Sequence, residues 1–373
     1  MKNTMGKMIG IIALCAVCLL TGCNNKEEQP KKEVVTEIPE ATVEAVLPTA
    51  IPQEATGSAV DVNQHEGEKR SKLTGLWIDK KLANKRPYAI MINNIKYAAG
   101  RHSGISQASV LYEAIVEGEI TRLMGIFEDF DGKKIGSVRS ARHYFVSIAD
   151  EYDAIYVHYG QTKYALSKIS ELGVDHLSGL SSEGTTVFYR DSSIKAPHNA
   201  FASYDGIMAG TELKGYRTKY RDNVKHFQFY SKNTNLKKAE KAEKITLGYS
   251  NKPYFEYDSK KKVYNRFQFG APHMDISNNT QVSFKNVLVQ FVREWNIDKN
   301  GYQTMDFANS SGKGYYATNG KVIEITWKKN ESTKEMHYYT TDGKELKMNP
   351  GKTYVAIYPD NRTDEVQFSG KND

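Results

Sequence analysis

Residues 110–127 read VLYEAIVEGEITRLMGIF, two runs of strand-forming residues on either side of Gly118. We expect a hairpin in which the glycine and the residue after it form a two-residue turn. This register places Arg122 on one face, diagonally between Glu113 and Glu117, where cross-strand neighbours interact. If the two carboxylates are partly buried, Arg122 is their natural counter-ion.

Two alternatives remain open for this stretch. Residues 106–117 could instead form a helix. The charges could be a structural ion pair, or they could be a carboxylate pair in a cleft, positioned by the arginine. In the second case Glu113 or Glu117 is a candidate general acid or base.

Residues 136–145 read GSVRSARHYF, and the pattern predicts a helix with Ser137 or Ser140 as its N-cap. Arg139 and Arg142 would then share a face of the first turn, where cations oppose the helix dipole. A bound phosphate, sulfate or carboxylate would compensate them, helped by free N–H groups at the helix end. Glu113 or Glu117 could do so internally, and both explanations stay open.

Residues 152–161 predict a strand that ends in polar residues, followed by a helix over residues 163–172. Ligands of α/β sheets bind beyond such strand ends, which makes His158 and Gln161 candidate ligand-binding residues. The loop at 195–201 adds His198 and Asn199, and we expect His158 and His198 to converge. His158 is also a catalytic candidate, although a lone histidine here can equally be a hydrogen-bonding group of the core.

Strands are also predicted at residues 86–94 and 185–190, so the first half mixes strands and helices. From residue 244 onward the pattern is nearly all β, with strands expected at 244–250, 254–258, 263–269, 282–295, 315–328, 336–340 and 354–358. Turn signals separate them at 318–320, 341–343 and 349–351. The predicted fold class is α+β, with a mixed α/β domain at 73–232 followed by a smaller, mostly antiparallel β domain at 233–373.

The N-terminus reads as a lipoprotein signal peptide over residues 1–22. A basic start and an apolar run lead to Leu20-Thr21-Gly22-Cys23, the pattern of a bacterial lipobox. It predicts cleavage before Cys23 and a fatty acyl group such as palmitate on its sulfur. The protein is then anchored by lipid to the outer face of the cytoplasmic membrane. No cysteine follows Cys23, so the mature chain has no disulfide and no thiolate site.

Residues 23–72 predict a disordered stalk, because they hold four of the ten prolines and no aromatic residue. The whole chain carries a formal net charge of +7, with 51 basic and 44 acidic residues. A basic exported body suggests anionic neighbours, and export argues against nucleic acid. The expected partners are the membrane, through the lipid on Cys23, and an anionic wall polymer or an envelope protein.

Catalytic signatures are missing from the chain. No Gly-x-Ser-x-Gly elbow, P-loop or His-Glu-x-x-His motif stands in a fitting context. Residues 272–275, Pro-His-Met-Asp, match no zinc spacing. We therefore predict no metal and no cofactor, and whether the protein is an enzyme stays open.

Residues 86–94, 112–127, 135–144 and 152–160, with Pro197-His198-Asn199 and residues 349–353, resemble the YerB-type family of Gram-positive lipoproteins. The resemblance covers nearly all of residues 75–360. Tyr159-Gly160-Gln161 departs from it, because a more glycine-rich turn is expected there. The resemblance implies a two-domain extracytoplasmic lipoprotein and no defined biochemical activity.

The hypothesis that these observations favour is a lipoprotein that binds an anionic envelope ligand. Its predicted ligand-binding residues are Arg122, Ser137, Arg139, Ser140, Arg142, His158, Gln161, His198 and Asn199. The alternatives are a cell-wall hydrolase or transferase that uses Glu113 or Glu117, and a structural partner of another envelope protein.

Overall fold

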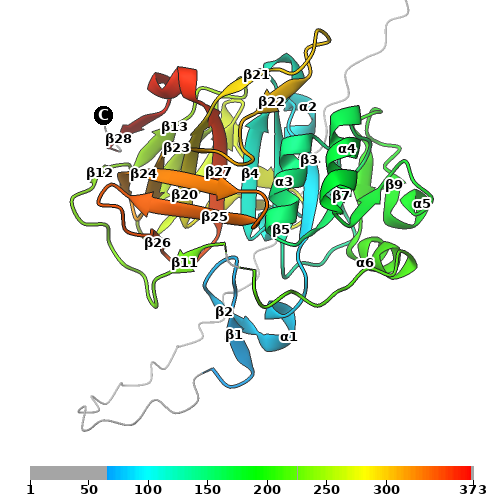
Figure 1. The fold of residues 1–373 in the computed structure, drawn as a ribbon, viewed down its shortest axis with the longest axis horizontal. Coiled ribbons are helices and arrows are strands. Elements are labelled where there is room, and N and C mark those ends of the chain that lie inside the picture. The colour runs from blue at the N-terminus through cyan, green and yellow to red at the C-terminus, as the bar shows by residue number, and fades with distance from the viewer. Residues whose placement is uncertain (1–64, 225, 371–373) are drawn as a thin grey trace, which may run out of the picture. The chain divides into compact units, whose positions relative to one another are not determined.

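The described part of the chain, residues 65–224 and 226–370 of a computed structural model, is built around an eleven-stranded sheet (Figure 1). The predicted signal peptide at 1–22, the predicted lipidation site Cys23 and most of the predicted stalk lie outside these residues. Within them, no helix is both long enough and apolar enough to cross a membrane.

The strands of this main sheet come from both halves of the sequence. Their order is β12 (Glu240–Lys241), β24 (Lys321–Asn330), β23 (Ser311–Thr318), β20 (Asn286–Val292), β27 (Thr353–Pro359), β4 (Val110–Ile115), β5 (Thr121–Phe127), β3 (Tyr88–Asn93), β7 (Ile155–His158) and β8 (His176–Ser178), with β25 (Glu335–Thr340) paired to β24.

The two halves meet where β27 lies parallel to β4, with Val355 opposite Tyr112. β27 also runs parallel to β20 on its other side, whereas most other pairings of the second half are antiparallel. Every residue of β27 and β4 is buried, as expected for strands covered on both faces. The fold is therefore α+β, with a mixed first half and a mostly antiparallel second half. The domain boundary between residues 232 and 233 stays a prediction.

The hairpin over residues 110–127 is confirmed, but its predicted register is wrong by one residue. Arg122 lies opposite Ala114, and Glu113 lies opposite Leu123. Because side chains alternate between the two faces of a strand, this slip puts Arg122 and Glu113 on opposite faces of the sheet.

The loop of the hairpin explains the slip. It is a three-residue 3₁₀ turn, Glu117–Glu119, closed by the Val116 N–H, which donates to the Ile120 carbonyl at 2.8 Å. Gly118 and Glu119 both have positive φ, +70° and +60°, which the glycine accepts without a Cβ clash. The expected two-residue turn would have paired each residue of β4 with the β5 residue one position later, for example Glu113 with Met124.

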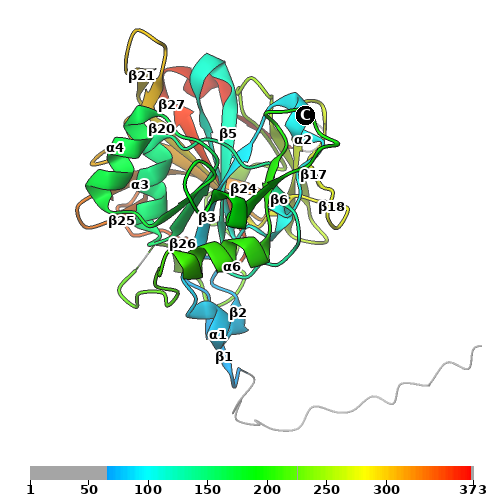
Figure 2. The same cartoon turned by 90° about the vertical axis from the view of Figure 1, so that its right-hand side faces the viewer.

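Each face of the main sheet has its own core. One face packs against α3 (His143–Glu151) and α4 (Lys163–Leu172), through side chains such as Phe145 and Ala165. The opposite face packs against α5 (Gly184–Val187) and α6 (Tyr204–Leu213), through Val187 and Ile207 (Figure 2).

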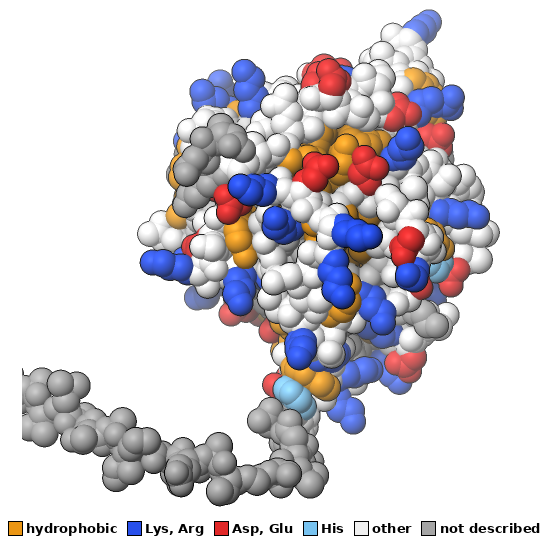
Figure 3. All heavy atoms as spheres, turned by 90° about the vertical axis from the view of Figure 1, so that its left-hand side faces the viewer, with side chains coloured by type: hydrophobic (Ala, Val, Ile, Leu, Met, Phe, Trp, Pro, Cys, Tyr) orange, Lys and Arg blue, Asp and Glu red, His pale blue; other side chains and the backbone are white. Residues whose placement is uncertain are grey.

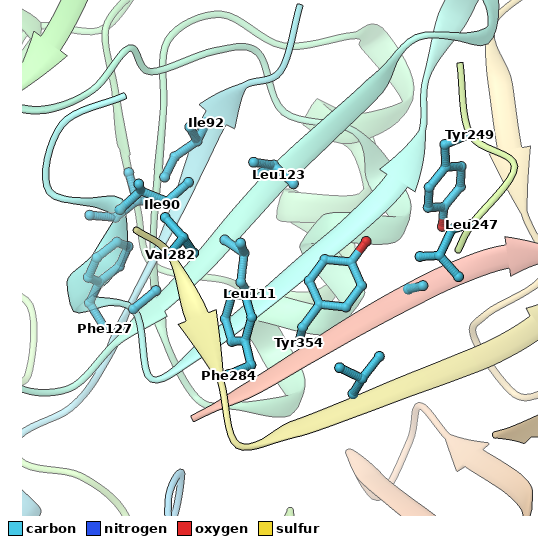
Figure 4. Packing of buried hydrophobic residues seen from close by; sticks show 14 of the residues in the cluster. Ile90, Ile92, Leu111, Leu123, Phe127, Leu247, Tyr249, Val282, Phe284 and Tyr354 are labelled. Atoms are coloured by element: carbon cyan, nitrogen blue, oxygen red, sulfur yellow. The ribbon is translucent and has the colours of Figure 1, made fainter. Parts of the chain in front are cut away.

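A smaller antiparallel sheet covers the second face beside β4 and β27. Its strands are β16 (Ala271–Pro272), β15 (Val263–Gln268), β14 (Tyr254–Asp258), β13 (Lys244–Thr246) and β28 (Gln367–Ser369), with β19 (Ser283–Phe284) paired to β15. Figure 4 shows Phe284 beside Leu111 and Tyr354 in this core, and the Phe284 and Tyr354 ring centroids lie 5.6 Å apart. The second half is thus bound to the first by pairing and by packing.

The remaining elements are short. They are β1 (Glu68–Arg70), β2 (Trp77–Asp79), α1 (Lys80–Ala83), α2 (Lys96–Ala99), a 3₁₀ turn at Ile105–Gln107, β6 (Ile135–Gly136), β9 (Phe188–Arg190), β10 (Ala200–Ala202), β11 (Gln228–Phe229), β17 (Met274–Asp275), β18 (Thr280–Gln281), β21 (Glu294–Asn296), β22 (Gln303–Met305), β26 (Lys347–Met348) and a 3₁₀ segment at Asp360–Glu365. Since β1 pairs with β2, the folded part begins before residue 73, inside the range predicted as stalk.

Several local predictions are confirmed, and two are corrected. The helix at 163–172 and the strand at 254–258 match α4 and β14. The helix after residue 136 begins later than predicted, at His143, and Arg142 occupies its N-cap without a side-chain capping bond. Residues 185–190, predicted as one strand, begin in α5 and continue as β9.

Candidate functional site

Residues 137–142 form an irregular segment that runs beside the C-terminal end of β3 and past that of β7. The Arg139 N–H donates to the Met91 carbonyl at 3.1 Å, and the Ala141 N–H donates to the Gly160 carbonyl at 2.9 Å. The Val138 N–H donates to the Ala200 carbonyl of β10 at 2.7 Å. Backbone bonds on three sides therefore hold the segment at the edge of the sheet where α/β proteins bind ligands.

Arg142 is paired with Glu117, the one carboxylate among residues 65–224 and 226–370 that bonds this segment. Its Nε donates to Glu117 Oε1 at 2.8 Å and to Oε2 at 2.9 Å, and its Nη2 also donates to Oε2. Burial raises the pKa of the Glu117 carboxyl, but the hydrogen bonds and charge of Arg142 outweigh burial and lower that pKa. The internal explanation for Arg142 is therefore confirmed, and Glu117 is ionised at neutral pH.

Arg122 lies behind Arg142 and is almost completely buried, with 6% of its surface exposed. It donates to the Ser140 carbonyl at 2.7 Å and forms no ion pair with any described carboxylate. Burial, and then the positive charge of Arg142, lower the pKa of its guanidinium to about 9. Its charge is thus held in an unfavourable environment.

Arg139 is half-buried beside the same group. Its Nη1 donates to the Pro197 carbonyl at 3.1 Å, while its Nε is buried and has no partner in the described part of the chain. Burial, and then Arg142 and Arg190, lower the pKa of its guanidinium. We call Arg122, Arg139, Arg142 and Arg190 the arginine cluster.

Arg190 is the member that the sequence did not suggest. It lies at the end of β9, with its guanidinium carbon 4.8 Å from the centroid of the Tyr159 ring. Its Nη1 donates to Asn199 Oδ1 at 2.8 Å, so Asn199 positions this arginine. The pairing of β9 with β10, in which Arg190 lies opposite Ala200, brings Arg190 here, and no local pattern marks it.

The two serines of the segment and Gln161 lie close by. Ser137 is buried, and its Oγ accepts from the Asn93 side-chain amide at 3.5 Å. Ser140 Oγ donates to the Tyr159 carbonyl at 3.2 Å. The Oε1 of Gln161 is buried and has no hydrogen-bond partner within the described residues.

His158 and His198 contact different partners. His158 is completely buried, its Nδ1 bonds the Gly160 carbonyl at 2.8 Å, and its Nε2 bonds His176 at 3.0 Å. Burial, and then His176, lower the pKa of His158 to about 3. Since both ring nitrogens are occupied, His158 is placed to hold the strand end.

His198 lies nearer the arginine cluster. Its Nδ1 accepts from the Asn93 amide at 3.0 Å, and its ring centroid lies 5.7 Å from that of Tyr97. Burial, and then the charge of Arg139, lower the pKa of His198, which keeps the imidazole neutral.

Glu113 lies on the far face of the sheet in a closed polar network. Its Oε2 accepts from Arg266 Nη2 and from the Tyr354 hydroxyl, each at 2.6 Å. Its Oε1 accepts from Asn94 at 3.0 Å, Thr121 at 2.6 Å and Asn251 at 2.8 Å. The predicted pairing of Glu113 with Arg122 is therefore wrong. The Glu113 side chain has no exposed surface and is inaccessible to a substrate.

A hydrogen-bond relay joins this network to the candidate site. Arg266 Nη1 donates to His273 Nδ1 at 2.6 Å, His273 bonds His102 at 2.6 Å, and His102 Nε2 bonds the Asn93 carbonyl at 2.5 Å. The carbonyl and the guanidinium at its ends fix the tautomers, so both histidines are neutral and each donates from Nε2. The Asn93 side chain then bonds His198.

The motif at residues 272–275 therefore has two structural roles. His273 is part of this relay, and Asp275 holds the loop at residues 104–106. Asp275 accepts from the Gly104 N–H at 3.0 Å and from the Ser106 N–H at 2.8 Å. Among the described residues, no group of three or more His, Cys, Asp or Glu side chains is arranged to hold a metal ion.

The structure is an α+β protein whose two halves share one sheet, and arginines gather at the end of β3. This chain matches known proteins over most of its length. Two family models match, the N-terminal domain of "Protein of unknown function (DUF3048)" at residues 73–217 and its C-terminal domain at 244–355. "Putative lipoprotein YerB" of Bacillus subtilis (strain 168) is 33% identical over 296 residues, 78% of this chain and 86% of that protein.

A solved structure agrees with the fold. The crystal structure of YerB protein from Bacillus subtilis superposes with a TM-score of 0.73 at 32% identity, covering 81% of this chain and all of that one. The chain therefore belongs to the DUF3048 family, the YerB-type family whose resemblance the sequence showed.

Proposed function

We propose that this protein is a lipoprotein, anchored through Cys23 at the outer face of the cytoplasmic membrane, that binds an anionic envelope ligand at the arginine cluster. The lipobox at residues 20–23 supports the anchor, as does the name of the B. subtilis relative. The basic body of the chain supports an anionic partner.

One observation carries the binding proposal, namely the imbalance of charge around residues 137–142. Four guanidinium groups gather there with one paired carboxylate, Glu117. Like charges held together at a half-buried site raise the free energy of the empty protein. An anion would relieve this repulsion, and the unpartnered Nε of Arg139 supplies a donor for it.

The chemistry of guanidinium narrows the ligand class. Its planar fork of donors matches the oxygens of phosphate, sulfate and carboxylate. A phosphate-containing wall polymer, a peptidoglycan stem carboxylate or an acidic segment of an envelope protein would satisfy it.

Calorimetric titration of the purified chain with inorganic phosphate and with muropeptides tests the proposal. Each charge-assisted bond contributes about 1.5–3 kcal/mol, so Arg139→Ala with Arg190→Ala should weaken binding by at least tenfold. Lys328→Ala, which removes an exposed charge on β24, is the matched control. Equal affinity of wild type and double variant would show that the cluster is not the site.

The anchor is tested separately. Mass spectrometry of the membrane-extracted protein should find acyl groups on the sulfur of Cys23 and no residues before it. Cys23→Ala should release the protein from the membrane fraction. A variant that stays with the membrane as firmly as the wild type would contradict lipid anchoring at this residue.

A further inference from the structure

One large cavity among the described residues lies away from the arginine cluster. It has a volume of about 920 Å³ and opens between the β1–β2 strand pair, the β14–β15 turn and the turn before β27. Pockets of roughly 300–1,000 Å³ accommodate small-molecule ligands. The cavity is therefore large enough for more than one small polar unit.

The charged side chains around this cavity are mostly cations. Only Glu128 and Asp129 are acidic, whereas six are basic: Arg70, Lys232, Lys261, Lys262, Lys285 and Lys352. Within the described part of the chain, none of the six forms an ion pair with a carboxylate. Figure 3 shows one face of the molecule, on which Lys and Arg side chains are spread more densely than Asp and Glu. The lining of the cavity thus carries an excess of positive charge.

Lys285 lies at the buried side of the cavity, with 9% of its surface exposed. Its ammonium donates to the Lys262 carbonyl at 3.1 Å and to Asn319 Oδ1 at 2.5 Å, both neutral acceptors. Burial, and then the charge of Lys262, lower the pKa of Lys285 to about 8. An ammonium has three N–H donors, so one remains for a ligand.

The turn at residues 349–351 makes this position possible. Gly351 has a φ of +143°, and a Cβ on it would lie 2.4 Å from the Cβ of Lys285. The missing side chain lets the Lys285 stem pass close to the backbone. The ammonium of Lys352, the next residue, donates to the Ser106 carbonyl. Burial lowers the pKa of Lys352 as well.

The two carboxyl groups of the lining, Glu128 and Asp129, form no ion pair with these lysines, and outside the lining the charge of Asp275 partly offsets the effect of burial on the pKa of Lys352. Burial raises the pKa of Glu128 to about 7, so this side chain is partly protonated at neutral pH. It accepts from the Ser71 hydroxyl at 2.5 Å, and its Oε1 is buried without a partner in the described residues. Asp129 is exposed.

We propose that this lysine cavity is a second anion site, separate from the arginine cluster, that binds the phosphate ester of a polyol. Lysine ammonium groups act as point charges for phosphate oxygens. Hydroxyl and amide side chains of the lining, such as Thr280, Gln281 and Ser283, can bond the hydroxyls of a polyol. The same chemistry occurs in a soluble polyol phosphate chain and in a phospholipid headgroup.

The test uses the mature chain with two probes, glycerol 3-phosphate oligomers and vesicles of phosphatidylglycerol mixed with phosphatidylcholine. Binding in either arm should weaken at least tenfold in Lys262→Ala with Lys352→Met. It should be unchanged in Lys328→Ala, and the two lysine substitutions should weaken it by the same factor in the Arg139→Ala, Arg190→Ala background. The arm that binds identifies the source of the polyol phosphate. Absence of binding in both arms, or equal binding by the lysine variants, would overturn the proposal.

A second measurement does not depend on the variants. The ¹⁵N resonance of the Lys285 side chain, followed against pH, should show its pKa rising from about 8 when the oligomer is added, because a bound phosphate favours the ammonium. An unchanged Lys285 titration at saturating oligomer would place the ligand elsewhere and contradict the proposal. A loss of phosphate binding confined to the arginine variants would contradict nothing proposed for the lysine cavity. The two proposals can therefore fail independently.

Discussion

Glu113 and Arg122 belong to one hairpin, lie near each other in sequence and point to opposite faces of the sheet. Around Glu113 each charge and most polar atoms have partners, and nothing is exposed. Around Arg122 lie three more guanidinium groups, of which only that of Arg142 is paired with a carboxylate within the described residues. The comparison separates two uses of charge: the balanced network holds the two halves together, and the unbalanced cluster is suited to a ligand.

Breaking the balanced network should have the largest effect. Glu113→Gln leaves the buried Arg266 without its carboxylate, and removal of one member of a buried pair costs about 3–5 kcal/mol. Urea unfolding followed by tryptophan fluorescence measures this loss. Glu324→Gln, an exposed substitution on β24, is the control and should change the free energy of unfolding by less than about 0.5 kcal/mol. Equal effects of the two substitutions would contradict a structural role for Glu113.

Mild acid should lower the free energy of unfolding, because the buried histidines bind protons more readily in the unfolded chain. Burial lowers the pKa of His102 to about 4 and that of His158 to about 3, whereas an unfolded histidine titrates near 6.5. The unfolded chain therefore binds more protons below pH 6.5, and the free energy of unfolding falls as the pH falls. At pH 5.5 we expect a loss of roughly 1.4 kcal/mol per histidine relative to pH 7.5 or above.

Unfolding free energies at pH 7.5, 6.5 and 5.5 check this prediction. His102→Gln removes one titrating group, so its stability should depend less steeply on pH than that of the wild type. An identical slope in the variant would show that His102 protonates freely in the folded protein.

Removing Glu117, the carboxylate paired with Arg142, should increase the excess of positive charge in the arginine cluster. Glu117→Gln loses the bonds from Arg142, which are partly exposed, so we expect a destabilisation of about 1 kcal/mol. The local charge becomes more positive, and phosphate should bind more tightly by about 1 kcal/mol, roughly fivefold. Weaker phosphate binding in this variant would indicate that Glu117 belongs to the binding surface itself.

The smallest effect on stability is expected at Arg139. Arg139→Ala removes one bond to the Pro197 carbonyl but also relieves repulsion from Arg142 and Arg190. The free energy of unfolding should change by less than about 0.5 kcal/mol. A loss of 2 kcal/mol or more in thermal or urea unfolding would mean that the cluster is part of the scaffold.

The sequence predicts the local features well because short-range rules govern them. Turn signals at residues 318–320 and 341–343 separate β23 from β24 and follow β25, as expected. The hairpin register failed because Glu119 takes a positive φ that its residue type does not announce.

The site was predicted only in part, because its partners come from distant segments. Arg139 and Arg142 were found from their spacing. Arg266, the true counter-ion of Glu113, lies 153 residues away in the chain, and Arg190 reaches the cluster through the pairing of β9 with β10. No pattern along the chain reports such contacts, since only the paired sheets of the folded protein create them.

The most direct test of this contrast is an anomalous diffraction experiment on crystals of the protein soaked briefly in selenate. The account predicts a selenium peak within hydrogen-bond distance of the Arg139 guanidinium, with Arg122 or Arg190 as a second contact, and none near Arg266. Selenate sites confined to other surfaces, with the guanidinium of Arg139 still bonded only to the Pro197 carbonyl, would contradict it.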